Sequence, residues 1–139
     1  MLKVNFYDDV EDHLFKYAVI ISRHQGKWVF CKHKERSTYE CPGGHREPGE
    51  NIHDTAKREL WEETGAIQFD IKPICVYSVV REASETFGML YYAEIYEFEQ
   101  LPNLEIEKIE FFEELSVEWT YPLIQPYLLK RVQESISQS

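Results

Sequence analysis

The sequence predicts an α/β fold, a sandwich of helices on both sides of a mixed β-sheet. Short apolar runs rich in β-branched residues alternate with two segments of helical periodicity, in the order strands, helix, strands, helix. The chain has 139 residues, of which 43% are hydrophobic, and this is the size of one ordinary domain with a core. No repeat, low-complexity tract or Gly/Ser/Pro-rich linker divides it, so we expect residues 1–139 to form a single domain.

The first strands are predicted from short β-branched runs. Residues 17–22 (YAVIIS) and 28–32 (WVFCK) are separated by turn residues 24–27, which predicts a hairpin. A third extended piece, residues 38–41, ends at a Pro-Gly-Gly turn at residues 42–44, where proline interrupts strand pairing and the glycines allow a sharp bend. A turn directly after a strand is a common place for functional residues.

The first helix is predicted after residue 51. Asn51 can cap its N-terminus, and Gly65 is expected to end it. Its apolar face recurs every four residues and consists of Ile52, Ala56 and Leu60. This face can anchor the helix on a sheet.

The second half of the chain is predicted to complete the sheet and add a second helix. Residues 67–80 and 87–98 have strand composition, and residues 106–112 form a further candidate strand. A C-terminal helix is expected after Pro122. The residues at helical spacing that should pack it on the sheet are Leu123, Tyr127, Leu128, Val132 and Ile136.

The net charge of −10 restricts the classes of ligand. Proteins that bind nucleic-acid polymers normally present a basic patch, whereas this chain would repel a long polyanion. A small polyphosphate can still bind if divalent cations offset its charge. The composition therefore argues against a nucleic-acid polymer, leaves a small polyphosphate as a candidate ligand and favours a bound metal.

The cysteines indicate a reducing compartment, and the hydropathy of the chain indicates that it is not inserted in a membrane. Three widely spaced cysteines form neither a disulfide framework nor a CxxC motif, so we expect buried thiols at Cys31, Cys41 and Cys75. No run approaches the roughly 18 apolar residues of a membrane span, and the first residues lack the apolar segment of a signal peptide. We therefore expect a cytoplasmic protein without a membrane partner.

The chemistry is predicted on the first helix. Glu59, Glu62 and Glu63 stand at positions i, i+3 and i+4, so their carboxylates share one face. Like charges this close repel one another unless a cation joins them, and Mg²⁺ accepts such oxygen ligands. Arg58 can orient a carboxylate, and the carbonyl of Gly43 is a further oxygen ligand. An acidic cluster taken alone is more often a solvated helix face.

The spacing of residues 44–66 resembles the Nudix box. The box is glycine, five residues, glutamate, seven residues, Arg-Glu, an aliphatic residue, any residue, Glu-Glu, any residue, glycine and an aliphatic residue. In this sequence those positions hold Gly44, Glu50, Arg58, Glu59, Leu60, Glu62, Glu63, Gly65 and Ala66. Ala66 is smaller than the usual Ile, Leu or Val. The strand, loop and helix around the box also resemble the family, which implies a Nudix-like α/β/α sandwich.

The resemblance implies a Mg²⁺-dependent hydrolase, with Mn²⁺ as a substitute, that attacks a phosphorus of a nucleoside diphosphate linked to another group. Glu59, Glu62, Glu63 and the carbonyl of Gly43 would be the metal ligands, and Arg58 would orient the carboxylates. The metal would neutralise phosphate oxygens and lower the pKa of a bound water.

A carboxylate must then take the proton of the attacking water. Spacing does not identify this carboxylate, because geometry toward the water decides it, and we take Glu59 as the first choice. Family members often use a glutamate downstream of the box as well, and Glu105 occupies such a position here, with Glu107 and Glu110 as rivals.

Residues around the glycine turn are the candidates for substrate contact. His45 and Arg46 follow the turn and could contact a phosphate, and Tyr39 precedes it and could contact a base. Other groups are interpreted as surface or core: the remaining histidines, the charged residues 32–36, and Trp28, Trp119 and Tyr121.

The box does not identify the substrate. An 8-oxo-dGTP-like nucleoside triphosphate, a nucleotide sugar such as ADP-ribose and a dinucleoside polyphosphate are all compatible with it, and the short chain slightly favours the first. The alternative function is a nucleotide-sensing module that keeps the fold without turnover, although every acidic position of the box is filled. Homodimers are common in the family, so a second copy of this chain is a candidate partner.

Overall fold

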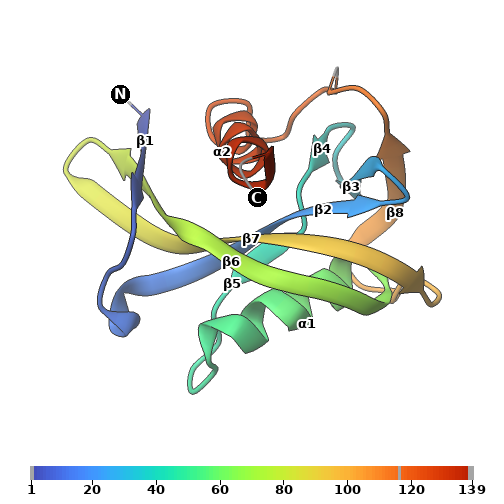
Figure 1. The fold of residues 1–139 in the computed structure, drawn as a ribbon, viewed down its shortest axis with the longest axis horizontal. Coiled ribbons are helices and arrows are strands. Elements are labelled where there is room, and N and C mark those ends of the chain that lie inside the picture. The colour runs from blue at the N-terminus through green and yellow to red at the C-terminus, as the bar shows by residue number, and fades with distance from the viewer. Residues whose placement is uncertain (1, 116, 138–139) are drawn as a thin grey trace.

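The strands of the computed structural model, which describes residues 2–115 and 117–137, form one mixed sheet with a helix on each face (Figure 1). The elements are β1 (Leu2–Tyr7), a 3₁₀ turn η1 (Asp12–Leu14), β2 (Phe15–His24), β3 (Lys27–His33), β4 (Tyr39–Glu40), β5 (Gly43–His45), α1 (Ile52–Thr64), β6 (Ala66–Arg81), β7 (Ser84–Phe98), β8 (Ile106–Phe112) and α2 (Gln125–Ser137). The predicted α/β sandwich is therefore confirmed.

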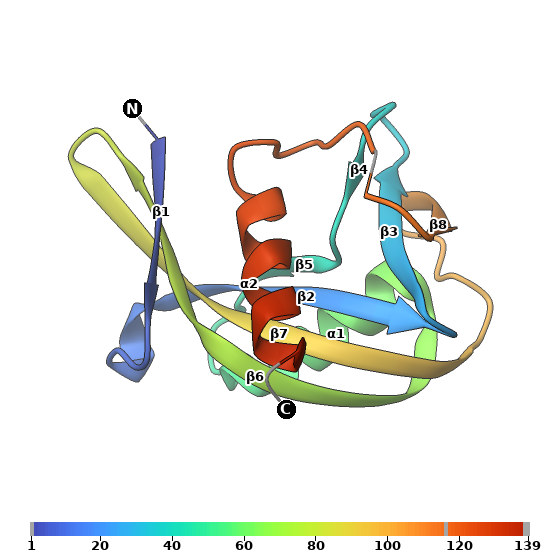
Figure 2. The ribbon, with the colours of Figure 1, turned by 45° about the horizontal axis from the view of Figure 1, so that its top comes forward.

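The sheet joins strands that lie far apart in the sequence. The strand order is β1-β6-β7-β2-β3-β4, with β5 beside β2 and β8 beside β3. Only the β2–β7 pair among the described strands is parallel. The long β6–β7 hairpin crosses the whole molecule, and β1 pairs with β6 at its distal end (Figure 2). The distal half of this hairpin lies beside the site described below.

Most elements expected from the sequence are present. The β2–β3 hairpin turns at Gln25 and Gly26, and β8 has the predicted bounds. At the start of α1, Asn51 Oδ1 accepts the His53 N–H at 2.8 Å, and Gly65 ends the helix with φ of 79°. The predicted helix and its two boundaries are thus confirmed.

Two strands were not expected. The sequence suggested a turn at residues 42–44, but Gly43–His45 form β5, which pairs with β2. Leu2–Tyr7 form β1, a strand that we did not predict although apolar Leu2, Val4 and Phe6 alternate with polar Lys3 and Asn5. Both strands are stabilised by pairing with a distant strand, which local sequence patterns do not report.

Each helix covers its own core. The apolar face of α1 packs on residues of β2, β6 and β7, and all three of its predicted anchors are buried: Ile52, Ala56 and Leu60. On the opposite face, α2 buries Leu128, Leu129 and Val132 against a second cluster. Successive residues of β2 alternate between the two clusters, as the pleat of a strand requires.

The face of α2 that meets the sheet agrees with the prediction at Leu128, Val132 and Ile136 and differs from it at two positions. Leu123 lies before the helix and is 60% exposed, and Tyr127 is 55% exposed. Because α2 begins at Gln125, helical spacing carries the buried stripe to Leu128 and Val132 and turns Tyr127 outward.

The three cysteines are free and buried, as expected. Within the described residues, no helix combines the length and apolar character needed to span a membrane.

Candidate functional site

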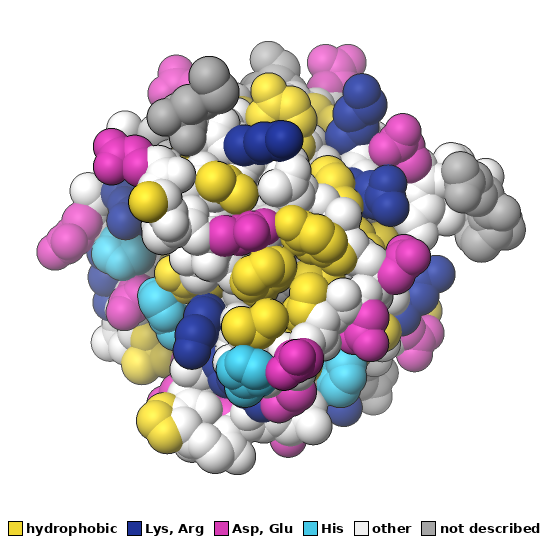
Figure 3. Space-filling view, turned by 90° about the vertical axis from the view of Figure 1, so that its left-hand side faces the viewer, with side chains coloured by type: hydrophobic (Ala, Val, Ile, Leu, Met, Phe, Trp, Pro, Cys, Tyr) yellow, Lys and Arg dark blue, Asp and Glu magenta, His cyan; other side chains and the backbone are white. Residues whose placement is uncertain are grey.

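A cavity of about 840 Å³ lies where α1, β4, β5 and the start of α2 meet the distal half of the β6–β7 hairpin. Its walls include the acidic face of α1 on one side and Tyr77, Val79 and Thr86 of the hairpin on another. Seen from the side of the hairpin tip, hydrophobic side chains gather at the centre of the face, with acidic, basic and histidine side chains around them (Figure 3). The cavity can therefore accept a ligand with one charged and one apolar part.

The acidic wall of the cavity is the helix face predicted from the sequence. Glu59, Glu62 and Glu63 all line the cavity, and the side chains of Glu59 and Glu62 are 12% and 24% exposed. The carboxylate of Glu59 packs so closely on Gly44 that a Cβ at that position would overlap it. Glycine on β5 thus provides the space that Glu59 occupies.

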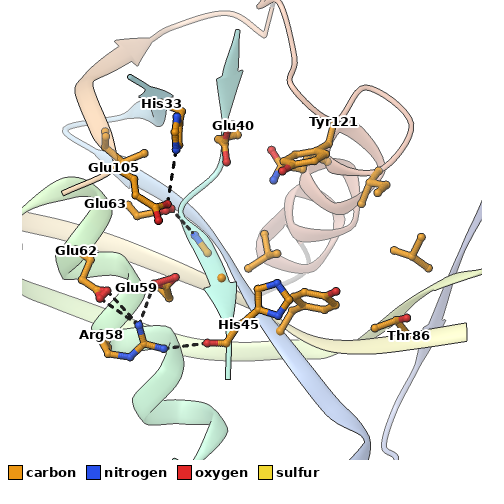
Figure 4. A pocket seen from close by; sticks show the side chains of 18 of the residues that line it. His33, Glu40, His45, Arg58, Glu59, Glu62, Glu63, Thr86, Glu105 and Tyr121 are labelled. Atoms are coloured by element: carbon orange, nitrogen blue, oxygen red, sulfur yellow. Dashed lines mark hydrogen bonds and ion pairs between the residues drawn. The ribbon is translucent and has the colours of Figure 1, made fainter. Parts of the chain in front are cut away.

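Arg58 joins this acidic face to the loop before the helix. Its Nε donates to Glu50 Oε2 at 2.7 Å, and its Nη2 donates to the carbonyl of His45 at 2.9 Å. Its Nη1 contacts Glu59 Oε1 and Glu62 Oε2, each at 3.1 Å (Figure 4). The hydrogen bond from Arg58 lowers the pKa of Glu50 to about 2. Arg58 therefore links the loop before the helix to two of the glutamates on its acidic face.

Two of the glutamates are poorly suited to carry a charge without a cation. Burial raises the pKa of Glu63 to about 9, although the N–H of Gly43 donates to its Oε1 at 2.9 Å. Burial, and then the neighbouring charge of Glu62, raises the pKa of Glu59 to about 7. Carboxylates that are desolvated and close together lower their free energy when they share a cation.

The side chains as they stand do not form a metal cage. No three acidic, histidine or cysteine side chains among the described residues are grouped so that they could hold a metal ion. The Nη1 group of Arg58 lies between Glu59 and Glu62 and supplies the positive charge there in place of a metal ion. In its chemistry the donor set nevertheless fits a divalent ion such as Mg²⁺, because carboxylate oxygens are the hard ligands that such ions prefer.

The three downstream glutamates lie in different surroundings. Glu105 lines the cavity, and its charge raises the pKa values of two of the helix glutamates. Glu107 pairs with Lys32 at 3.0 Å, and Glu110 pairs with Lys108 at 2.8 Å; neither lines the cavity. Glu105 is the downstream glutamate that the fold brings to the acidic face of α1.

The predicted substrate-contact residues are separated by the fold. His45 lines the cavity and its ring lies 4.5 Å from that of Tyr17. Arg46 instead lines a second, open pocket and pairs with Asp12 at 2.9 Å. Tyr39 packs in the α2-side core and donates to Glu110, outside the cavity lining. Of the three, His45 is the one that lines the cavity.

Several cavity residues were not singled out from the sequence as site residues, among them Arg36, Glu40, Tyr121 and Gln125. Arg36 donates to Glu40 Oε1 at 3.0 Å, and its guanidinium lies 5.8 Å from the ring centre of Tyr121. Gln125 is 6% exposed, and its Oε1 accepts the N–H of Cys41 at 2.8 Å. The sequence shows that Arg36 and Glu40 stand four residues apart. No sequence pattern, however, indicates that residues 36–40 lie beside residues 121–125 in the fold.

A family model described as NUDIX domain matches residues 13–131 of the chain. The Bacillus subtilis protein YtkD, to which 8-oxo-dGTP diphosphatase activity is ascribed, is 33% identical over 99 residues, which cover 71% of this chain. The chain spans 62% of the length of that relative.

Solved structures are similar over most of the chain. The Bacillus subtilis pyrophosphohydrolase BsRppH has a TM-score of 0.79 at 28% identity, covering 96% of this chain and 90% of that one. A Caenorhabditis elegans Ap4A hydrolase has a TM-score of 0.66 at 17% identity, covering 89% of this chain and 100% of that one, and so shares the fold.

Proposed function

This chain belongs to the NUDIX family, and we propose that it is a hydrolase that cleaves a phosphoanhydride bond of a nucleoside diphosphate linked to another group, with Mg²⁺ as the cofactor and Mn²⁺ as a substitute. The observation that carries the proposal is the face of α1, where three glutamates meet a cavity and two of them have raised pKa values. The activities in the names of two similar proteins support it: YtkD is described as an 8-oxo-dGTP diphosphatase, and BsRppH as a pyrophosphohydrolase.

The proposed metal ligands are Glu59, Glu62, Glu63 and the carbonyl of Gly43. When bound, the ion would neutralise phosphate oxygens and favour ionisation of the attacking water. Arg58 keeps the carboxylates on one side of the helix through its contacts with Glu59 and Glu62, and its bond to the His45 carbonyl keeps β5 beside them. The charge of the guanidinium also limits the repulsion between these carboxylates before the ion arrives.

Glu105 is the proposed acceptor of the proton from water, ahead of Glu59. The carboxylate of Glu59 is 12% exposed and engaged with Arg58, and it would be a metal ligand. Glu105 lines the same cavity and is 77% exposed, so water can reach it. A general base must lie within hydrogen-bonding reach of the water that it deprotonates, and Glu105 can meet this requirement without giving up a contact to the metal.

The proposed substrate is an 8-oxo-dGTP-like nucleoside triphosphate. Gln125 uses its carbonyl oxygen for Cys41, which leaves its NH₂ group as a donor in a cavity wall. The neighbouring carboxylate of Glu40, 12% exposed and held by Arg36, is an acceptor. Guanine presents the O6 acceptor beside N–H donors, which matches this pair. Tyr121 offers an aromatic face to the base at the cavity rim.

The test is hydrolysis of a panel containing 8-oxo-dGTP, dGTP, dATP, ADP-ribose and diadenosine tetraphosphate, with Mg²⁺, with Mn²⁺ and with EDTA. We expect metal-dependent release of pyrophosphate and a nucleoside monophosphate from the guanine triphosphates. If protein shown to be folded hydrolysed none of these compounds, the result would favour the non-catalytic nucleotide-sensing module. Turnover of ADP-ribose or diadenosine tetraphosphate instead would keep the reaction and replace the substrate.

The base assignment has its own test in Glu40→Gln. We expect KM for guanine nucleotides to rise about 10-fold or more, since a paired base contact contributes about 1–3 kcal/mol of discrimination. The preference for dGTP over dATP should shrink by the same factor. Glu118→Gln, the same change of charge at an exposed position, is the matched control and should leave KM unaltered. An unchanged preference in Glu40→Gln would place the base elsewhere.

A further inference from the structure

We propose that His33 is a positioning residue that holds Glu105 over the acidic face of α1, an inference that rests on the proposed function. Nε2 of His33 lies 3.7 Å from Glu105 Oε2, and both residues line the cavity (Figure 4). Glu105 makes no other side-chain hydrogen bond or ion pair within the described chain.

Glu105 needs such a restraint because its side chain is free in other respects. It stands in the segment before β8 and is 77% exposed, so water surrounds most of it. An exposed glutamate samples several rotamers. If a contact already restrains it in the free enzyme, less conformational entropy has to be lost on the way to the transition state. A proton acceptor that must meet one water molecule benefits directly from this.

The backbone gives His33 a defined position relative to Glu105. His33 is the last residue of β3 and pairs with Ile106 at the start of β8. The N–H of Lys34 donates to the carbonyl of Glu105 at 2.9 Å, which continues the pairing beyond the strand ends. The two side chains are therefore attached to neighbouring, hydrogen-bonded backbone segments of one sheet.

The hydrogen bonding of the ring also orients its proton. The N–H of Glu35 donates to His33 Nδ1 at 3.2 Å, so Nδ1 is an acceptor and carries no proton in the neutral ring. The proton of the neutral imidazole then sits on Nε2, which faces Glu105. At 3.7 Å the contact restrains Glu105 by attraction. Catalytic contacts are often this long in a free enzyme and tighten in the substrate complex.

Four variants test the role of His33: His33→Ala, His33→Gln, Glu105→Gln and the double variant His33→Ala/Glu105→Gln. We expect His33→Ala to lower kcat about 10-fold with little change in KM, as expected for lost orientation of one group. His33→Gln keeps an N–H donor and should recover most of the activity. The double variant should match Glu105→Gln, because His33 acts through Glu105.

His13→Ala is the matched control, since it removes another His–Glu contact, 3.4 Å from Glu11, at an exposed position. It should leave kcat and KM unchanged. Three kinetic results would overturn the proposal: a normal kcat in His33→Ala, a change confined to KM, or a further loss when His33→Ala is added to Glu105→Gln.

A readout without turnover separates this proposal from the proposed function. Side-chain carboxyl ¹³C relaxation of Glu105 should show restricted motion in the unaltered protein and greater motion in His33→Ala. Equal mobility in both proteins would overturn the positioning role even if the enzyme were active. An inactive protein with a restrained Glu105 would contradict only the proposed function.

Discussion

At the scale of single residues, the burial of Glu59 and Glu63 determines how the stability of the fold depends on pH. The folded-state pKa of Glu59 is raised from its ordinary value of 4.5 to about 7, and that of Glu63 is raised from the same value to about 9. A raised pKa means that the folded state holds protons that the unfolded state has released. The stability contributed by these protons is present below pH 4.5 and is lost as the pH rises through about 7 and about 9.

We therefore expect the melting temperature of the metal-free protein to fall between pH 5 and pH 9, roughly the range between the unfolded and folded pKa values. The lowered pKa of Glu50, about 2, acts only in more acidic solution and does not disturb this range. Melts in EDTA and in Mg²⁺ measure the effect, and Mg²⁺ should stabilise most at high pH. Glu63→Gln should flatten the EDTA curve. A melting temperature that rises through the range would contradict the assigned surroundings of both glutamates.

Glu62→Gln tests the metal-ligand assignment at a single carboxylate. The side chain lies on a helix surface and is 24% exposed, so the fold should persist. We expect kcat/KM to fall by at least the ~10–100-fold that outer-shell partners of a metal cost when removed. Circular dichroism checks the fold, and Glu113→Gln, the same substitution at a side chain 78% exposed, is the control. Full activity in Glu62→Gln would exclude this carboxylate as a ligand.

At the scale of elements, two glycines at the ends of the box have separable roles. A Cβ on Gly44 of β5 would overlap the carboxylate of Glu59, which is the mobile end of a side chain. A Cβ on Gly65 would lie 2.6 Å from the carbonyl oxygen of Glu99, and Gly65 has a φ of 79°. The first glycine makes room for a functional group, and the second ends the helix.

We expect Gly44→Ala to remove activity with little change in melting temperature, because Glu59 can rotate away from the new methyl group. Gly65→Ala should instead cost about 1–3 kcal/mol of stability, because the left-handed backbone and the carbonyl contact cannot relax as easily. Urea unfolding and kcat/KM measured on both variants distinguish the two effects. Equal loss of stability in the two variants would show that Gly44 is structural.

At the scale of the whole molecule, the net charge of −10 opposes binding of a polyanion. Added salt screens this repulsion, since the Debye length falls from about 30 Å at 0.01 M to about 10 Å at 0.1 M. We expect a non-hydrolysable dGTP analogue in EDTA to bind more tightly as NaCl increases, as measured by calorimetry. A nucleic-acid binder shows the opposite slope. Weaker binding at higher salt would indicate a basic surface that dominates the approach of the ligand.

The sequence alone was sufficient for the features that depend on neighbouring residues. Helix α1, its cap at Asn51 and its end at Gly65 follow from local hydrogen bonds and from φ, and the shared face of Glu59, Glu62 and Glu63 follows from 3.6 residues per turn. Hence the α/β class, the first helix and the acidic face could all be predicted.

Only the tertiary structure decided which distant residues join that face. Glu105 and Gln125 reach the cavity through pairing of β3 with β8 and packing of α2 on the sheet, and Tyr39 is turned out of it by the pleat of β4. Sheet pairing and packing act between segments tens of residues apart, and their energy depends on surfaces that exist only after folding. Periodicity along the chain reports which face of an element a residue occupies, whereas the assembled sheet decides what that face meets.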